Sequence, residues 1–311
     1  MLSRIAESLM WIGRYVERAD DTARILEVHI HMLVEDPWAD EPAMCQQLLA
    51  IMGIDPPAGP SVDRDRVIRL LVDDLDNPSS IVGSLSAARQ NARGAREIVS
   101  SEMWETLNAT WIALPEARRR ARQLGMHTFF QWVRERTAIV TGVADSTMSR
   151  DDCWNFLVLG RSLERIDMTA RLITTQSLTD RDQTPWMMLL RSCGAYETFL
   201  RTYRGAVGED NAAEFLLLDR LFPRSIFCAL SMAETCLAEL DPSSDRAGVG
   251  DEARRLLGRA RLGLEFRGAR DLLTDLPAQM DSLQRTCTAV SEAVAQRYFP
   301  AARMTAWALE H

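Results

Sequence analysis

The chain contains one twelve-residue pattern twice, and this duplication limits the possible folds more than any other feature. The segment GRYVERADDTAR at 13–24 matches GRSLERIDMTAR at 160–171 in eight of twelve positions. A second pair keeps the same order, because PSSIVGSLS at 78–86 aligns with PRSIFCALS at 223–231, 145 residues later. Collinear matches at nearly constant spacing indicate an internal repeat. The chain is therefore expected to contain a duplicated unit.

Apolar residues in the N-terminal segment recur at alternating steps of three and four. They are Leu2, Ile5, Leu9, Ile12, Val16, Ala19, Ala23, Leu26, Ile30 and Leu33. This spacing predicts one long helix with a single buried seam. Further helical periods are found at 41–53, 63–75, 79–112, 116–147, 151–177, 185–204, 210–220, 223–240, 251–272 and 277–298. We expect an all-α protein of two tandem homologous helical-bundle repeats, residues 1–147 and 148–311, related by pseudo-twofold symmetry.

The composition excludes several classes of function. All 36 basic side chains are arginine, so a lysine Schiff base and a Walker-type lysine are excluded. The net charge of −8 opposes nucleic acid or anionic lipid as a general partner. No run approaches the ~18 apolar residues that a membrane span requires. The six cysteines form no C-x-x-C pair, and we expect a cytoplasmic protein that is not embedded in a membrane.

The repeated pattern places charged residues on both sides of the apolar seam. Helical spacing puts two sets along matching flanks, Gly13, Glu17, Asp20 and Arg24 in the first copy and Gly160, Glu164, Asp167 and Arg171 in the second. The opposite flanks carry arginine pairs one turn apart, Arg14 with Arg18 and Arg161 with Arg165. A mid-helix glycine costs about 1 kcal/mol relative to alanine. Its presence in both copies indicates close approach of another helix or of a ligand.

These charged flanks have two interpretations. The glutamates and arginines of the two copies can form a buried ion-pair network that holds the two units in register. Alternatively, the arginines can bind a carboxylate, a phosphate or a peptide, because guanidinium groups pair with such anions through two hydrogen bonds. Packing of the two pattern helices against each other would bring both flanks to a shared junction, where binding pockets often form. Both interpretations remain open from the sequence.

Other arginine-rich segments extend the list of candidates. Arg93 and Arg96 lie in ARQNARGARE at 88–97 and could form a second wall of a pocket, although an ordinary solvated helix face is an alternative. The segment RRRAR at 118–122 is interpreted as a solvated face. The candidate ligand-binding residues are Arg14, Glu17, Arg18, Asp20, Arg24, Arg93, Arg96, Arg161, Glu164, Arg165, Asp167, Arg171 and Arg224.

Familiar enzyme motifs do not match the chain. None of the four histidines follows a glutamate by three residues, as a di-metal bundle requires, so no metal site is expected. His29 and His31 lie two residues apart and diverge around a helix, which makes joint chelation from one helix unfavourable. GVGDE at 248–252 lacks the third glycine and the preceding strand of a dinucleotide fingerprint. We expect no cofactor, and the cysteines are interpreted as structural.

Several segments together resemble the bacterial alpha-E family, which is named for its helices and its Glu-Arg motif. They are WIGRYVERADDTAR at 11–24, the second Glu-Arg pair at 164–165, NARGARE at 91–97 and PRSI at 223–226. The resemblance spans essentially the whole chain. It implies an accessory protein encoded beside ATP-grasp ligases and transglutaminase-like proteins, in systems proposed to form peptide or amide bonds. It assigns no catalytic residue.

Two functions follow as hypotheses. The first is a non-catalytic accessory, binding or scaffold protein of a peptide- or amide-forming system, which acts with an ATP-grasp ligase and binds a peptide or acidic small molecule. The second is an enzyme of the same pathway, in which Glu17 or Glu164 is a general base and arginines hold a carboxylate, peptide or phosphate substrate. Whether the protein is an enzyme therefore remains open at this point.

Overall fold

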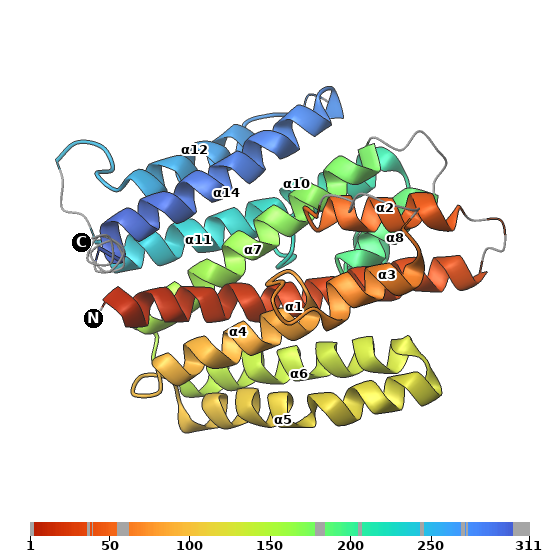
Figure 1. The fold of residues 1–311 in the computed structure, drawn as a ribbon. Coiled ribbons are helices and arrows are strands. Elements are labelled where there is room, and N and C mark those ends of the chain that lie inside the picture. The colour runs from red at the N-terminus through yellow and green to blue at the C-terminus, as the bar shows by residue number, and fades with distance from the viewer. Residues whose placement is uncertain are drawn as a thin grey trace, which may run out of the picture.

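Two long helices cross at the centre of the molecule. The structure is a computed structural model that describes residues 3–35, 38, 40–54, 62–177, 184–204, 207–242, 246–268, 271 and 273–300. Helix α1 (Ser3–Glu35) and helix α7 (Asp152–Ser177) carry the two copies of the repeated pattern, and they pack against each other (Figure 1). The described residues contain helices and no strand, which confirms the expected all-α class.

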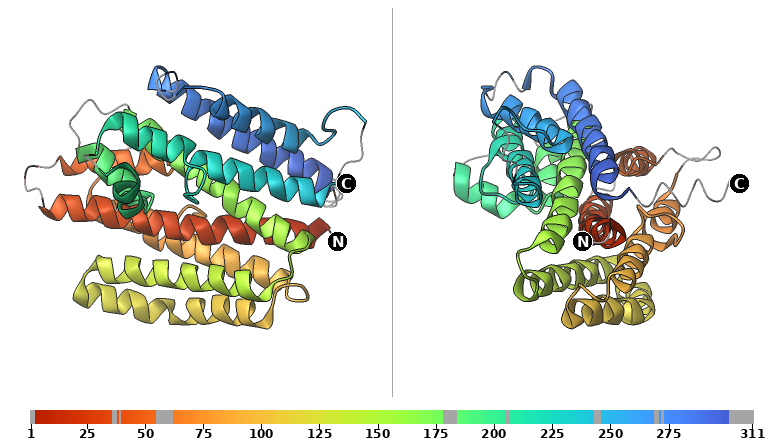
Figure 2. Two further views of the ribbon diagram at one scale, coloured as in Figure 1. Left: turned by 180° about the vertical axis from the view of Figure 1, so that it is seen from behind. Right: turned by 90° about the vertical axis from the view of Figure 1, so that its left-hand side faces the viewer.

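The remaining long helices form layers on either side of this pair. Helices α4 (Ile81–Gly94) and α6 (Met126–Thr147) pack on α1, and α5 (Ser101–Leu124) packs on both. Helices α11 (Ile226–Leu240) and α14 (Leu276–Tyr298) pack on α7, and α12 (Glu252–Glu265) packs on both. The views in Figure 2 place the two layers on opposite sides of the molecule.

Short helices exchange between the two halves of the chain. Helix α2 (Glu41–Ile51) comes from the first half but contacts α7, whereas α8 (Thr184–Ser192) comes from the second half and contacts α1. The other short elements are α3 (Arg64–Ile68), the π-helical turn η1 (Arg69–Asp73), α9 (Tyr196–Tyr203) and α10 (Glu209–Leu218). Each half therefore covers part of the other half's long helix.

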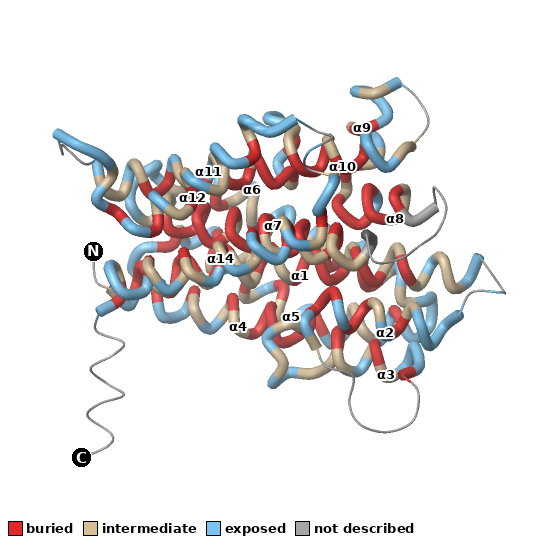
Figure 3. The backbone as a smooth tube through the Cα atoms, turned by 90° about the horizontal axis from the view of Figure 1, so that it is seen from above, coloured by how far each residue is buried: buried red, intermediate tan, exposed pale blue. Residues whose placement is uncertain are grey.

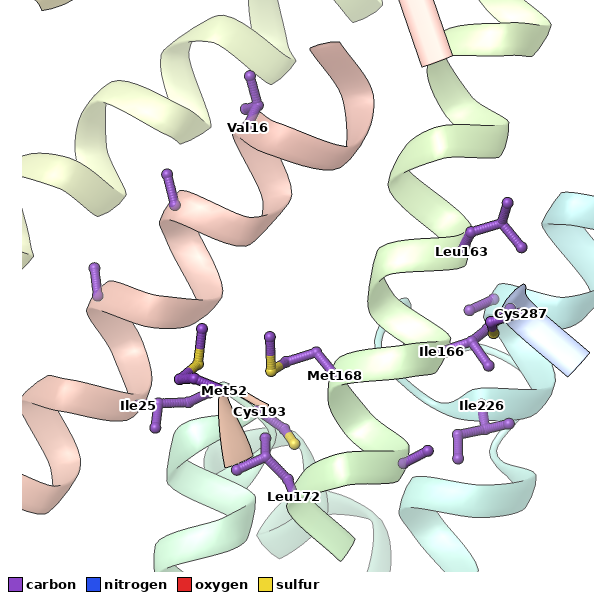
Figure 4. Close-up of a cluster of buried hydrophobic side chains, with 14 of the residues drawn as sticks. Val16, Ile25, Met52, Leu163, Ile166, Met168, Leu172, Cys193, Ile226 and Cys287 are labelled. Carbon is purple, nitrogen blue, oxygen red and sulfur yellow. The ribbon is translucent and has the colours of Figure 1, made fainter. Parts of the chain in front are cut away.

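Buried apolar residues of both halves belong to one continuous core. Figure 3 shows buried positions along the inward sides of the helices and exposed positions along their outer sides. In the close-up of Figure 4, Ile25 of α1, Met168 and Leu172 of α7, Met52 and Cys193 belong to the same cluster. Unbranched Met side chains suit such a junction because they fill irregular gaps between helices. The core thus joins the two halves.

Some expected helix boundaries are wrong. The periodicity predicts helices at 79–112 and 116–147, but the chain breaks between α4 and α5 and again at Gly125. Ser100 causes the first break, because its hydroxyl accepts a hydrogen bond from the Met103 N–H and caps α5. Gly125 causes the second break, with a φ of 102°. Pro115 falls in the gap between the two expected helices, but it lies inside α5 in the structure. The helix expected at 185–204 likewise breaks at Gly194, whose φ is 62°.

The hydropathy of the helices and the state of the cysteines bear on two expectations drawn from the composition. None of the described helices combines the length and the apolar character needed to cross a membrane. All six cysteines are free thiols, and four of them are buried.

Candidate functional site

Two glycines allow α1 and α7 to touch at their crossing. A Cβ atom on Gly13 would lie within 3.0 Å of the carbonyl oxygen of Leu157, and one on Gly160 would lie within 3.0 Å of the carbonyl oxygen of Met10. Real Cβ atoms essentially never approach backbone so closely. The mid-helix glycines therefore mark the close approach of another helix, one of the two possibilities expected from the sequence. This contact brings the charged flanks of both helices together.

Glu164 of α7 is enclosed by two arginines of α1. Its Oε2 lies 2.8 Å from Arg14 Nε, and its Oε1 lies 2.5 Å from Arg18 Nε, while Arg18 Nη2 donates a second bond of 3.0 Å to Oε2. The residue is 1% exposed. Burial alone would raise the pKa of this carboxyl, but Arg18 and Arg14 lower it to about 2. Glu164 is therefore a buried and fully ionised carboxylate.

Glu17 of α1 has the reciprocal environment. Arg165 of α7 donates from Nε to Oε1 at 2.8 Å and from Nη2 to Oε2 at 3.0 Å, and Arg224 Nη2 lies 2.7 Å from Oε1. Burial again opposes ionisation, but Arg224 and Arg165 lower the pKa of Glu17 to about 2. The two glutamates of the pattern are thus held by arginines of the opposite helix. Neither could be assigned these partners from spacing alone.

Arg224 lies among three carboxylates at the start of α11. Its guanidinium contacts Asp20 Oδ2 at 2.5 Å and Asp21 Oδ1 at 3.2 Å, in addition to Glu17. The three carboxylate groups have oxygens within 4.8 Å of one another, a spacing that could hold a metal ion. Here the guanidinium supplies the positive charge among these oxygens.

Asp21 differs from its neighbours because one of its oxygens has no partner. Its Oδ2 is buried without a hydrogen bond among the described residues. Burial raises the pKa of this carboxyl to about 8, and the nearby carboxylates of Glu17 and Asp20 add to the increase against the opposing effect of Arg224. The aligned position in the second copy of the pattern is Met168, and Ser79 aligns with Arg224. Asp21 and Arg224 therefore form a pair that the other side of the junction lacks.

The outer members of the pattern form ion pairs within their own helices. Arg24 Nη2 lies 2.9 Å from Asp20 Oδ2, and Arg171 Nε lies 3.0 Å from Asp167 Oδ2. Arg161 lies 3.6 Å from Asp145, so it does not repeat the contact that Arg14 makes with Glu164. A pocket of about 420 Å³ lies beside Asp167 and Arg171.

Two other sequence-predicted residues lie outside the crossing. Arg93 and Arg96 are exposed, and the Arg96 guanidinium lies 5.1 Å from the ring centre of Trp104. The structure thus brings together ten of the thirteen candidates around the α1–α7 crossing and its ion pairs. They are Arg14, Glu17, Arg18, Asp20, Arg24, Glu164, Arg165, Asp167, Arg171 and Arg224. Arg161 stays on α7 beside Asp145.

A larger pocket of about 1280 Å³ lies at the C-terminal end of α1. It is formed by α1, α3, the junction of α5 with α6, and the segment from α8 to α9, so both halves contribute. Of the sequence-predicted residues only Arg24 lines it. Its other basic residues are Arg64, Arg122, Arg134 and Arg191, with His31 and His127. Sequence reasoning missed these residues because they come from four separate segments, and Arg122 was interpreted as part of a solvated face.

Comparison with known proteins identifies relatives in mycobacteria. Uncharacterized proteins of Mycobacterium bovis and Mycobacterium tuberculosis are each 27% identical to this chain over 266 residues. The matches cover 78% of this chain but 30% of each relative, so the chain spans less than a third of the length of these curated relatives. No solved structure matches the chain.

The family match accounts for nearly the whole sequence. Residues 1–299 match the family model Alpha-E, described as a predicted alpha-helical domain with a conserved ER motif. Glu-Arg pairs occur at 17–18 and 164–165, where the structure places the reciprocal ion pairs of the helix crossing. The extent of this match, together with the all-helical fold, shows that the chain belongs to the Alpha-E family.

Proposed function

We propose that this chain is a non-catalytic accessory protein that binds or scaffolds within a bacterial peptide- or amide-forming system. The observation that carries the proposal is that Glu17 and Glu164 each form ion pairs with two arginines, which enclose the carboxylate. The resemblance to alpha-E proteins supports an ATP-grasp ligase, with a transglutaminase-like protein nearby, as the partner. The ion-pair network would then serve to hold the two halves in one orientation.

The low pKa values of the two glutamates argue against a catalytic role for them. A general base works best when its pKa lies near the operating pH, because a weaker base accepts a proton poorly. Both carboxyls have pKa values of about 2, and both are buried among hydrogen bonds to guanidinium groups. A substrate proton could reach either oxygen only after these ion pairs open. The geometry therefore favours a structural role for the repeated pattern.

The binding half of the proposal is supported by the pocket at the end of α1. Five arginines and three carboxylates line it, and it lies where the two halves meet. Junctions of this kind are common places for ligand sites. The pocket is separate from the reciprocal glutamate pairs, so one region can maintain the architecture while another binds.

We further propose that the chain consists of two tandem units, 1–147 and 148–311, with pseudo-twofold symmetry. Helix α4 packs on α1 as α11 packs on α7, and α6 packs on α1 as α14 packs on α7. The reciprocal contacts of Gly13 and Gly160 support the same relation. Gly53 follows the end of α2 and lies near Arg171, just as Gly194 follows the end of α8 and lies near Arg24. These correspondences would follow from duplication of one unit.

The structural role is tested by Glu164→Gln. Loss of one partner from a buried ion pair leaves the remaining charges uncompensated, so we expect the free energy of unfolding to fall by about 3 kcal/mol. Glu116→Gln is the matched control, because Glu116 pairs with Arg119 on an exposed helix face and its loss should change stability little. Urea unfolding followed by circular dichroism measures both. A Glu164→Gln variant as stable as the parent would overturn the structural interpretation.

The accessory role is tested by co-purification. The tagged chain is co-expressed with an ATP-grasp ligase from the same genome, and the expected result is co-elution in size-exclusion chromatography. The alternative function, an enzyme acting on a carboxylate, peptide or phosphate substrate, predicts turnover by the isolated chain that Glu17→Gln abolishes without loss of the fold. Such turnover would refute the non-catalytic proposal.

A further inference from the structure

The pocket at the end of α1 is larger than a site for one small metabolite. Its volume of about 1280 Å³ exceeds the roughly 300–1,000 Å³ that is usual for small-molecule sites. Four separate parts of the chain form its walls, with residues from α1, from α3, from 121–134 and from 188–197. A ligand that fills this volume must be long enough to touch several walls.

Three of the five arginines in the pocket form no ion pair with a carboxylate of the residues that the structure describes. Arg24 is paired with Asp20 at 2.9 Å, and Arg134 is paired with Glu27 at 2.5 Å. By contrast, no side-chain ion pair forms at Arg64, Arg122 or Arg191 within the described part of the chain. These three come from α3, α5 and α8, so their guanidinium groups belong to three different walls.

Two of these arginines also stabilise the ends of their own helices, but this interaction does not occupy their hydrogen-bond donors. Arg122 and Arg191 each lie in the last turn of a helix, where a cation offsets the negative end of the helix dipole. That interaction leaves the hydrogen-bond donors of each guanidinium available to an anion. Arg191 is further held 5.0 Å from the ring centre of Tyr196, which orients its planar group. Several separated carboxylates on one ligand would satisfy these donors.

Apolar side chains occupy the wall between the arginines. Met32, Met126 and Met188 come from three different helices, and Tyr196 adds aromatic surface. Methionine adapts to varied shapes because its side chain is unbranched and flexible. A ligand that fits this surface carries apolar groups between its acidic ones.

Two acidic side chains in the same pocket favour a ligand that also carries hydrogen-bond donors over a ligand that is anionic along its whole length. Asp65 and Glu197 line the pocket, and neither has an ion-pair partner among the residues that the structure describes. Like charges would repel the closely spaced phosphates of a polyphosphate or nucleic acid. A peptide backbone, in contrast, offers N–H donors to these carboxylates.

We propose that the pocket binds an extended peptide segment in which acidic side chains alternate with apolar ones. The inference rests on the proposed function in treating the chain as a binding protein, and it adds the class of ligand and the location of the site. Arg64, Arg122 and Arg191 pair with the acidic side chains, and the methionines contact the apolar ones. The repeated pattern at the helix crossing supports the pocket but contacts no ligand, apart from Arg24 in its wall.

The test uses a fluorescein-labelled octapeptide of alternating glutamate and leucine, with the full chain and no ligase present. Fluorescence anisotropy should show saturable binding that weakens as salt concentration increases, because the contacts are between charges. The matching peptide of alternating glutamine and leucine should bind at least tenfold more weakly. Equal affinity for the two peptides would overturn the role of the acidic groups.

Variants locate the site. Arg122→Gln and Arg191→Gln should each weaken binding of the glutamate–leucine peptide by about tenfold, since each removes a charge-assisted hydrogen bond. Arg119→Gln is the matched control, because Arg119 lies on the same helix as Arg122 but outside the pocket and is paired with Glu116. It removes the same charge and should leave affinity unchanged. Equal affinity for the parent and both pocket variants would refute the proposed location.

Competition separates the ligand classes. Unlabelled peptide should displace the probe, whereas tripolyphosphate at the same concentration should not. Displacement by tripolyphosphate at lower concentration than by peptide would refute the peptide assignment. Because the ligase is absent, failure of peptide binding leaves the proposed docking to a ligase intact. Failure of co-elution with a ligase would likewise leave the peptide site standing.

Discussion

Alanine at Gly13 tests whether the backbone contact between α1 and α7 positions the ion-pair network. In an ordinary helix interior, replacing glycine with alanine stabilises the fold by about 1 kcal/mol. At Gly13 the new Cβ would lie within 3.0 Å of the Leu157 carbonyl oxygen, and that oxygen belongs to the helix backbone and cannot rotate away. The helices must therefore separate by on the order of 1 Å to restore a normal contact.

This separation affects the charges as well as the packing. The pairs of Arg18 with Glu164 and of Arg165 with Glu17 have bond lengths between 2.5 and 3.0 Å. Moving the helices apart by that amount takes these bonds beyond favourable hydrogen-bond geometry. Because these hydrogen bonds weaken and the interface is also overpacked, we expect Gly13→Ala to lower the free energy of unfolding by about 3 kcal/mol. The melting temperature should fall by about 6 °C, at roughly 2 °C per kcal/mol for a large chain.

The assay is urea and thermal unfolding followed by circular dichroism at 222 nm. Gly142→Ala is the matched control, because Gly142 lies in the exposed part of α6 and a Cβ there has no neighbour within 4 Å. The control should be more stable than the parent by about 0.5–1 kcal/mol. A Gly13→Ala variant that is equally stabilised would refute the reasoning.

The reciprocal site adds a second criterion. Gly160→Ala should be as costly as Gly13→Ala, since its Cβ meets the Met10 carbonyl oxygen at the same crossing. One outward displacement of the helices relieves both clashes, so the double variant should lose less stability than the two single variants combined. Strict additivity would mean that the two glycines act independently.

The remaining predictions concern protonation and helix capping. The pKa values of Glu17 and Glu164 lie at about 2, below the ordinary 4.5. Each residue therefore contributes roughly 3 kcal/mol to the free energy of unfolding above pH 4.5, and this contribution is lost as the pH falls toward 2. Acid unfolding measures the loss. Asp21 has the opposite sign: its pKa of about 8 exceeds the ordinary 3.8, so its contribution is complete below pH 3.8 and is lost as the pH rises through 8. Asp21→Asn should therefore remove a decline in urea stability between about pH 4 and pH 8, and persistence of that decline would contradict the assignment. Ser80→Ala and Ser225→Ala should each cost about 1–2 kcal/mol in urea unfolding, because each hydroxyl caps a helix and also donates to a backbone carbonyl, of Asp74 and of Asp219; an unchanged midpoint would contradict this.

Local patterns in the sequence predicted the central helices well. The apolar seam from Ile5 to Leu33 lies on α1, whereas its first expected member, Leu2, lies outside the described residues. The second copy of the pattern lies on α7. The glycines also indicated a close neighbour, since helical glycine is costly without one. These predictions succeed because helix periodicity and glycine conformational cost are local properties.

The partners of the charged residues could not be predicted in the same way. Either glutamate could have faced solvent, a ligand or the other helix, because spacing gives the side of a helix but not what lies against it. Arg224 is separated from Glu17 by more than 200 positions, and only the folded chain brings them together. The pocket arginines were missed for the same reason. Helix ends failed where a single capping side chain, such as Ser100, outweighed a continuing apolar period.

The exchanged positions of α2 and α8 bear on how such a chain could have arisen. Suppose that the two halves descend from one unit. In each half, one face of the long helix is now covered by a short helix of the other half. In the single unit, that face would have been uncovered. Its ancestor would then have been a homodimer in which each subunit lent its short helix to the other. In a homodimer both copies of the interface are identical by symmetry. On that hypothesis, joining the two genes would have removed the restriction, so that a change such as Asp21 with Arg224 could enter one side of the interface alone.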